Sequence, residues 1–416
     1  MSQKLPISDF EWMEKKELDK YNKDYKEVIF MEDGDEGCYF EVDIHIPESV
    51  HDKMNEYPIA EQVRITNDMI SLYSKKLATK FEIKEDTVSK LVPNLNDKVK
   101  YICHFRALQK YIMLGCEVTK FHRALKFKQK AWLASYIDFN TKQRAMARNE
   151  FEKSFFKLLN NSIFGKTMED TRSHIDAKLC SNIKQKDRSM SSPKCKSWKI
   201  IDENLVFMEN HKSQIKLNKP IYCGVAVLDL SKICMVDFHY DYIKKKYADK
   251  AQLCFTDTDS LFYEIETEDL YEEMWKDKHE FDFSDYPTEG VMSKYQSNDN
   301  KKVIGKFKDE TLGVPIKEFV GLKAKCYSVL TAGDKQKCTA KGIKQCIKNK
   351  ELKHEVYKSC LFNERETYHT QRTFKSTKHD VYSIEQYKKS LSCMDNKRFL
   401  ANDGIHTRAY GHYLNK

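Results

Sequence analysis

The sequence predicts an α+β fold, and three stretches carry that prediction. Apolar and polar residues alternate strictly from Tyr39 to Ile46, which is typical of a half-buried strand. Residues 150–165 show the helical spacing of apolar residues, and two short apolar runs flank the segment TDTDS at residues 256–260 as in a β-hairpin. Strand and helix patterns therefore occupy separate parts of one chain.

Size and charge set broad limits on this chain. It has 416 residues, 40% of them hydrophobic, which is enough for a buried core and two to three lobes. Lys and Arg number 72 against 63 Asp and Glu, a net charge of +9. This excess fits a polyanionic partner such as nucleic acid, although solubility alone also explains it. Lysines cluster among apolar residues at 127–130, 242–247 and 341–350, where solvated helix faces are the simpler interpretation.

The cysteines and the apolar runs exclude several classes of protein. The 13 cysteines include no CxxC pair, so we expect no disulfide framework and no zinc or iron–sulfur module. No apolar run approaches the roughly 20 residues of a membrane span, and the segment MSQKLPISDFEW lacks the apolar core of a signal peptide. We therefore expect a soluble intracellular protein without a membrane partner.

The remaining segments are taken in chain order. Residues 1–120 read as mixed α/β, and residues 121–172 as the most helical part. The polar, Ser/Lys-rich stretch 173–219 predicts an insertion or irregular lobe, and residues 221–247 predict a long helix that leads into the hairpin. Residues 266–300 are acidic and loop-like, 305–330 return to strand patterning, and 341–416 read as helical and basic.

The hairpin carries two carboxylates, Asp257 and Asp259, two residues apart. In an extended chain this spacing directs both side chains to one side. Hard oxygen ligands on a rigid hairpin suit Mg²⁺ and hence phosphate chemistry, while an ordinary polar turn is the alternative.

A second candidate surface lies on the helix that includes KLLNNSIFG, residues 157–165. One stripe of this helix consists of Phe151, Phe155, Leu158 and Ser162. Lys157, Asn161 and Phe164 fall together on a different side, followed by Gly165. A Lys one turn before an Asn offers a charge for a triphosphate and an amide for a base or sugar. A third element, Lys325 and Tyr327 in KCY, places a cation and an aromatic ring on one strand face, where they suit a primer strand.

These three motifs, in this order, resemble those of family B DNA polymerases of the protein-primed branch, found in bacteriophages, linear plasmids, eukaryotic viruses and self-synthesising DNA elements. The resemblance covers nearly the whole chain. It implies an antiparallel palm with helical fingers and thumb: partial palm and an insertion in 1–120, fingers helices in 121–172, a second insertion in 173–219, palm with the metal hairpin in 220–340, and a thumb-like helical region in 341–416.

The resemblance also implies roles and partners. The nucleotide-binding residues would be Lys157, Asn161, Ser162, Phe164 and Gly165. Asp257 and Asp259 would be the catalytic, metal-binding carboxylates, and Lys325 and Tyr327 would hold the primer. The implied cofactor is Mg²⁺ in a two-metal site, and the implied partners are primer–template DNA, a dNTP and, in this branch, a terminal priming protein. The nucleus, the mitochondrion and a viral replication site all remain open as its location.

The chain departs from the family pattern in three places. Phe164 and Phe255 stand where the family has Tyr, which keeps each ring and removes one hydroxyl. The first polymerase motif, Asp-x-x-Ser-Leu-Tyr-Pro, which supplies the remaining metal carboxylate, is absent. The opening segment resembles the stretch directly after that motif in relatives, so we expect Met1 to lie just past it and the exonuclease domain to be missing too. The two-metal site is therefore expected to be incomplete. Possible substitute ligands are Glu41, Asp43 and Asp229.

These patterns lead to three functional hypotheses. The first is a DNA polymerase that adds dNTPs to a 3′ or protein hydroxyl. The second is a catalytically inactive DNA- or nucleotide-binding fragment, or a mobile-element remnant. The third is an unrelated metal-dependent nuclease that combines Glu41 and Asp43 with the hairpin; this hypothesis leaves the motif at 157–165 without a role.

Overall fold

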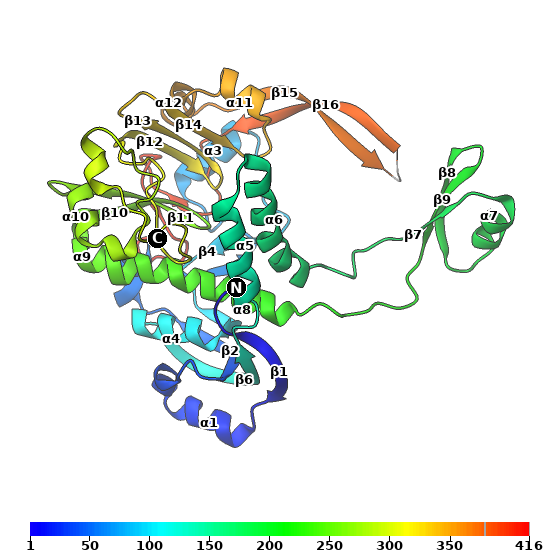
Figure 1. The fold of residues 1–416 in the computed structure, drawn as a ribbon, viewed down its shortest axis with the longest axis horizontal. Helices are drawn as coiled ribbons and strands as arrows, with labels where there is room; N and C mark the ends of the chain where they lie inside the picture. Colours follow the sequence, from blue (N-terminus) through cyan, green and yellow to red (C-terminus); the bar gives the residue numbers. More distant parts are fainter. Residues whose placement is uncertain (378–379, 416) are drawn as a thin grey trace.

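The computed structural model describes residues 1–377 and 380–415, and it shows a mixed α/β fold built around a four-stranded antiparallel sheet (Figure 1). In spatial order the sheet contains β1 (Leu5–Trp12), β6 (Glu117–Lys130), β2 (Glu36–His45) and β5 (Lys98–His104). Helices α1 (Lys15–Lys23), α4 (Phe105–Leu114) and α8 (Ile221–Asp237) pack against it. The largest hydrophobic core lies between this sheet and these helices.

Strand β2 shows why the sheet forms where the alternation predicts it. Phe40, Val42 and Ile44 are fully buried in the core, while Glu41 and Asp43 between them remain partly exposed. A strand with one apolar face gains stability only when that face is covered, and α4 supplies part of the cover. The predicted half-buried strand is confirmed.

Two helices form a pair above the sheet, α5 (Ala134–Met146) and α6 (Glu150–Thr167), and they pack against each other (Figure 1). Helix α6 begins at a capped N-terminus: the Asn149 side chain accepts a hydrogen bond from the Glu152 amide, and Glu152 Oε2 accepts one from the amide of Arg148, the residue before the cap, both at 2.9 Å. The predicted helix over 150–165 is confirmed. The prediction of helix from residue 121 onward is wrong for residues 121–130, which belong to β6.

A second region contains two further sheets. The hairpin of β10 (Ala251–Asp257) and β11 (Ser260–Ile265) forms a two-stranded sheet, and β12 (Ile316–Lys323), β13 (Cys326–Thr331) and β14 (Gln336–Ala340) form a three-stranded one. The predicted hairpin is confirmed. Within the described residues its strands pair only with each other, and its assignment to a palm stays a prediction.

Residues 176–210 form a small lobe, which Figure 1 shows well apart from the four-stranded sheet and its helices. The small lobe contains β7 (Asp176–Cys180), α7 (Ile183–Met190), β8 (Cys195–Asp202) and β9 (Leu205–Asn210), in the sheet order β7-β9-β8. Two extended linkers connect it to α6 and to α8. The sequence predicts an insertion or irregular lobe at this place; residues 176–210 form a regular three-stranded sheet with one helix, so the irregular alternative is wrong.

The C-terminal part differs from the helical prediction. Only α11 (Gln345–Glu351) and α12 (His354–Phe362) are helices in residues 341–377 and 380–415. A long hairpin of β15 (Thr367–Thr377) and β16 (Asp380–Leu391) follows and projects from the molecule (Figure 1). Its tip contacts the small lobe through an ion pair between Lys199 of β8 and Asp380.

The shorter elements complete the fold. They are α2 (His51–Met54), β3 (Ala60–Val63), α3 (Leu72–Lys80), β4 (Lys90–Pro93), α9 (Lys245–Tyr247), α10 (Leu270–Lys276), β17 (Phe399–Leu400) and β18 (Thr407–Arg408). Helix α8 continues through a π-helical segment, Phe238–Lys244, into α9, which confirms the predicted long helix over 221–247. Across residues 1–377 and 380–415, none of the helices combines the length and apolar character that crossing a bilayer requires.

Candidate nucleotide and primer site

The β10–β11 hairpin presents its carboxylates at a tight turn. Asp257 ends β10 and pairs with Ser260, while Thr258 and Asp259 form the turn itself. Thr258 has a φ of 60°, and the Asp259 amide donates to the Asp257 carbonyl over 2.7 Å. Asp259 therefore lies in the turn and is exposed, so the argument from alternating side chains in an extended chain does not apply to this pair.

Lys325 lies directly against this turn. It occupies the connection between β12 and β13 with a φ of 59°, and its Nζ donates to Asp257 Oδ1 at 2.6 Å. The Asp257 side chain is 22% exposed and that of Lys325 50%, so both groups remain accessible to a ligand. The fold thus brings together two predicted motifs that are 68 residues apart in the sequence.

Aromatic packing fixes the two motifs relative to each other. The ring of Tyr327 lies 5.1 Å from that of Phe255 and 5.4 Å from that of Phe262, and Phe262 stacks on Phe319 at 4.8 Å. Gly321 permits this approach, because a Cβ there would lie only 3.1 Å from both Phe255 and Phe319. Tyr327 is only 6% exposed, so its ring serves this packing.

Glu56 supports the base of the hairpin, and the sequence analysis did not identify it. Its carboxylate accepts from Lys244 Nζ at 2.8 Å and from the Leu253 amide of β10 at 3.3 Å. The buried His239 lies 3.6 Å from the same carboxylate, and its other ring nitrogen is 2.9 Å from the Tyr263 hydroxyl of β11. Burial lowers the pKa of His239 to about 4, so this imidazole is neutral at pH 7. Glu56 lies in an irregular segment without periodicity, so no sequence signal marked it.

The motif at 157–165 lies on the second half of α6. Lys157, Asn161, Ser162 and Gly165 are exposed, and Phe164 is half-buried. Ser162 donates to the Leu159 carbonyl of its own helix. Within residues 1–377 and 380–415, no hydrogen bond or ion pair joins this motif to the hairpin or to Lys325. The roles of these residues in nucleotide binding therefore remain predictions.

The carboxylates do not by themselves fit a Mg²⁺ site. Across the described ranges, no group of three or more His, Cys, Asp or Glu side chains lies close enough together to hold a metal ion. One of the two hairpin carboxylates already has Lys325 as its counter-charge. Mg²⁺ in proteins usually binds one or two carboxylates and completes its octahedron with waters and substrate phosphates. Asp257 and Asp259 would therefore supply only part of its ligands, and Asp257 would have to release Lys325.

The proposed substitute ligands have other partners. Glu41 and Asp43 lie on β2 and pair with Arg123 at 2.6 Å and His122 at 2.8 Å. Asp229 is buried on α8, accepts from the His104 amide at 2.8 Å, and has a raised pKa because of its burial. The nuclease hypothesis, which required Glu41 and Asp43 beside the hairpin in one metal cluster, is therefore wrong for the part of the chain described.

Comparisons with known proteins found similar solved structures but no similar sequence. No protein family model matches the sequence, and no curated protein matches it. Solved structures that resemble the chain include three of Phi29 DNA polymerase, at 12–13% sequence identity. Two are Phi29 DNA polymerase with primer–template DNA, which has a TM-score of 0.47, and the free enzyme in an orthorhombic crystal form, with a TM-score of 0.49. A third, the ternary complex with incoming nucleotide substrates, has a TM-score of 0.46.

The matched length is unequal between the two partners of each comparison. The likeness covers 93–94% of this chain but 55% of each polymerase chain. The chain therefore spans about half the length of the structures it matches. A functional proposal for this protein must depend on the motifs and contacts of this chain alone.

Proposed function

We propose that this chain is the primer- and nucleotide-binding part of a DNA-directed DNA polymerase of the protein-primed family B type. One observation carries the proposal: Lys325 Nζ lies 2.6 Å from Asp257 Oδ1. This contact joins the Lys-x-Tyr motif to the Asp-Thr-Asp motif, as a site that holds a primer end beside reacting phosphates requires. The motif of 157–165 adds a Lys and an Asn on an exposed helix face.

Each group of site residues would bind a different part of the substrates. Lys325 would hold a primer phosphate, with the Tyr327 ring keeping the surrounding strands in place. The nucleotide would bind to Lys157, Asn161, Ser162, Phe164 and Gly165. Asp257 and Asp259 would face the reacting end of the primer, where a dNTP is added to a 3′ or protein hydroxyl. A metal-dependent reaction at this site would need further ligands, because the carboxylates present do not complete a metal site.

The second candidate function is DNA or nucleotide binding without turnover. The same ion pair favours it, because Lys325 compensates a carboxylate that an active metal site would use. In this case the chain would bind DNA through its excess of lysines, and the affinity would fall steeply with salt concentration.

Primer extension by the wild-type chain separates the two candidates. We expect dNTP incorporation with Mg²⁺ or Mn²⁺, and a loss of about 100-fold or more in Asp259→Ala, because metal stabilisation of transition-state charge is worth several kcal/mol. Glu264→Gln is the matched control, since Glu264 is an exposed acid on β11 of the same hairpin. No extension with either metal would reject the polymerase proposal. DNA binding without extension would then support the second candidate.

A further inference from the structure

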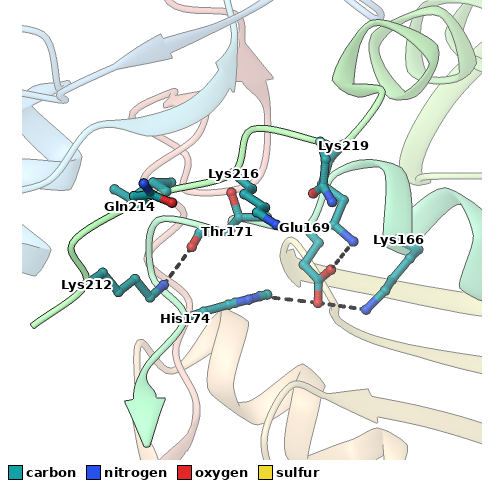
Figure 2. Close-up of a pocket in the computed structure, with 10 residues that line it drawn as sticks. Lys166, Glu169, Thr171, His174, Lys212, Gln214, Lys216 and Lys219 are labelled. Atoms are coloured by element: carbon teal, nitrogen blue, oxygen red, sulfur yellow. Dashed lines mark hydrogen bonds and ion pairs between the residues drawn. The ribbon is translucent and has the colours of Figure 1, made fainter. Parts of the chain in front are cut away.

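A cavity of about 390 Å³ lies at the base of the small lobe, where its two linkers meet the end of α6. This linker pocket is lined by Lys166, Glu169, His174, Lys212, Lys216 and Lys219, among others. Lys166 belongs to the last turn of α6, and the other residues come from the incoming and outgoing linkers (Figure 2). A volume of this size lies within the roughly 300–1,000 Å³ of small-ligand sites. The candidate primer site contributes no residue to it.

Glu169 holds three of the basic groups in the linker pocket. Its Oε1 lies 2.9 Å from Lys166 Nζ and 3.3 Å from His174 Nε2, and its Oε2 lies 2.8 Å from Lys219 Nζ (Figure 2). These contacts join the end of α6 to both linkers. The hydrogen bonds from Lys219 and Lys166 lower the pKa of Glu169 to about 2, so this carboxylate stays ionised at any physiological pH.

The other two lysines have no carboxylate partner in the described ranges. Lys212 Nζ donates to the Thr171 carbonyl at 2.8 Å and to the Arg172 carbonyl at 3.4 Å, which fixes its position without neutralising its charge. For Lys216 the described residues supply no hydrogen bond and no ion pair, and Figure 2 shows it between Thr171 and Lys219. The linker pocket thus contains four ammonium groups and one carboxylate, with an excess positive charge.

A purely structural role explains only part of this arrangement. Glu169 with Lys166 and Lys219 is enough to tie the linkers together. Lys212 and Lys216 add like charges to the same cavity, and like charges in proximity disfavour each other unless an anion joins them. An ordinary surface lysine avoids this cost by extending into solvent, whereas Lys212 is held against two carbonyls at the cavity wall.

The lining also limits the kind of anion. It contains lysines and amides but no Phe, Tyr or Trp, and Ile215 is its one large apolar side chain. The imidazole of His174 is its one ring, and its Nε2 lies 3.3 Å from Glu169. A free nucleotide is normally gripped at its base by an aromatic or apolar surface, whereas backbone phosphates need only charge. The linker pocket lies between two linkers whose residues 172–175 and 213–218 are exposed to solvent.

We infer that the linker pocket binds the backbone phosphates of a single nucleic-acid strand, without reading its bases, through Lys212 and Lys216. The choice of a nucleic-acid strand as the anion rests on the proposed function, whereas the anion site rests on the pocket itself. Phosphate groups could also reach this pocket as a free triphosphate or pyrophosphate, so the experiment includes both sources.

The test compares the wild type with K212Q/K216Q in binding a fluorescein-labelled oligo-dT of about 20 nucleotides, measured by anisotropy. We expect an affinity loss on the order of 10-fold and a decrease of about 1.4 in the slope of log K against log salt, for two lost phosphate contacts. The control is K15Q/K16Q, which removes the same charge from exposed positions on α1 without altering the linker pocket. dTTP and pyrophosphate serve as separate competitors.

A second measurement reports on the site itself. Lysine acetylation with a succinimidyl ester, read out by mass spectrometry, should show that oligo-dT protects Lys212 and Lys216 but not Lys15 and Lys16. An equal loss of affinity in both double variants, or no protection of Lys212 and Lys216, would overturn the inference. Protection by dTTP or pyrophosphate at equal concentration, with none by oligo-dT, would overturn the assignment to a strand.

The outcome is independent of primer extension. Pocket-dependent strand binding by a chain that extends no primer would support the inference while rejecting the polymerase proposal. Primer extension by the wild-type chain, together with an unchanged slope of log K against log salt in K212Q/K216Q, would support the polymerase proposal and reject the inference about the linker pocket.

Discussion

The four-stranded sheet with its helices and the small lobe are both antiparallel structures, but they are stabilised very differently. The sheet β1-β6-β2-β5 rests on a core that includes Phe40 and Phe105, both fully buried, and three helices cover it. In the small lobe, the core cluster of buried residues is Cys180, Val206 and Met208. Along β8, Trp198 is 48% exposed and Ile200 61% exposed.

This difference shows that the sheet region is stable through its own core, whereas the small lobe needs support from outside it. A segment of residues 176–210 is shorter than the roughly 40 residues below which domains usually need a disulfide, a metal or a partner. Its cysteines are free, so it has no covalent support from them. The small lobe therefore depends on its two linkers, and the partly exposed Lys199–Asp380 ion pair adds little, while the sheet region is stable by its own burial.

The largest effect should come from Phe40→Ala in β2. Phe40 packs edge-on against Tyr21 at 5.3 Å and Phe121 at 5.2 Å, and it has no exposed surface. We expect a loss of about 3–5 kcal/mol in the free energy of unfolding, measured with urea. Ile102→Ala is the control, because Ile102 lies opposite Glu41 in the same sheet and is 58% exposed; it should change stability by about 0.5 kcal/mol or less. Equal losses would contradict the view that this face holds the main core.

Lys98 in β5 tests how large an unfavourable burial the sheet region tolerates. Its side chain is fully buried, and its Nζ donates to the Asn96 carbonyl at 2.6 Å and to Asn94. Burial lowers the pKa of Lys98 from 10.5 to about 8, although Glu61 opposes the shift. The unfolded chain then binds more protons than the folded one between about pH 8 and 10.5, so stability from this group rises with pH in that window.

The expected cost of the charged Lys98 below pH 8 is about 3 kcal/mol. The free energies of unfolding of Lys98→Met and the wild type, compared at about pH 7 and about pH 10, isolate this cost. The wild type should gain stability relative to the variant at the higher pH. Lys16→Met, at an exposed position on α1, should show no such trend. A pH-independent difference for Lys98→Met would indicate that Lys98 keeps an ordinary pKa.

Met208→Ala should act on the small lobe alone. Met208 is fully buried in β9, and its truncation should cost about 2 kcal/mol of local stability. Hydrogen exchange followed by mass spectrometry should show faster exchange in residues 176–210 and unchanged exchange in β2 and β6. Faster exchange in both regions would show that they unfold as one unit, which would break the comparison.

The smallest effect belongs to the contact between the small lobe and the β15–β16 hairpin. Lys199 and Asp380 are both partly exposed, and exposed ion pairs are worth about 0–1 kcal/mol. A double-mutant cycle with Lys199→Ala and Asp380→Ala should give a coupling energy below about 1 kcal/mol in thermal unfolding. A larger value would mean that the contact is a main support of the small lobe.

Much of the fold could be predicted wherever the apolar pattern is periodic. The alternation around Phe40 gave β2, the spacing after Asn149 gave α6, and residues 221–247 gave one long helix. Strand β6 was missed because its buried positions do not alternate regularly: bulges in its pairing with β2 interrupt the period of two. The β15–β16 hairpin was missed because both strands are mostly exposed, so no apolar periodicity marks them.

The motifs named the residues of the candidate site, and their roles stay predictions; their contacts could not be predicted. The motifs singled out Asp257, Asp259 and Lys325, and the structure brings Lys325 to Asp257. The place of Asp259 in the turn depends on the pairing of Asp257 with Ser260, a register that residue spacing does not specify. The linker pocket could not be predicted, because its lysines come from residues 166 and 212–219, on opposite sides of the small lobe.

The sequence by itself determined the local elements whose apolar pattern is periodic, because periodic burial and turn residues act over a few neighbouring positions. Only the tertiary structure decided which charges meet. The ion pair of Lys325 with Asp257 joins residues that are 68 positions apart in the sequence. Glu169 joins Lys166 to Lys219, and the whole small lobe lies between these two lysines in the sequence. Electrostatic interactions depend on distances in space, which are set by how the sheets and helices pack. This packing brings the charge of Lys325 to the hairpin carboxylates and the charge of Glu169 to the lysines of the linker pocket.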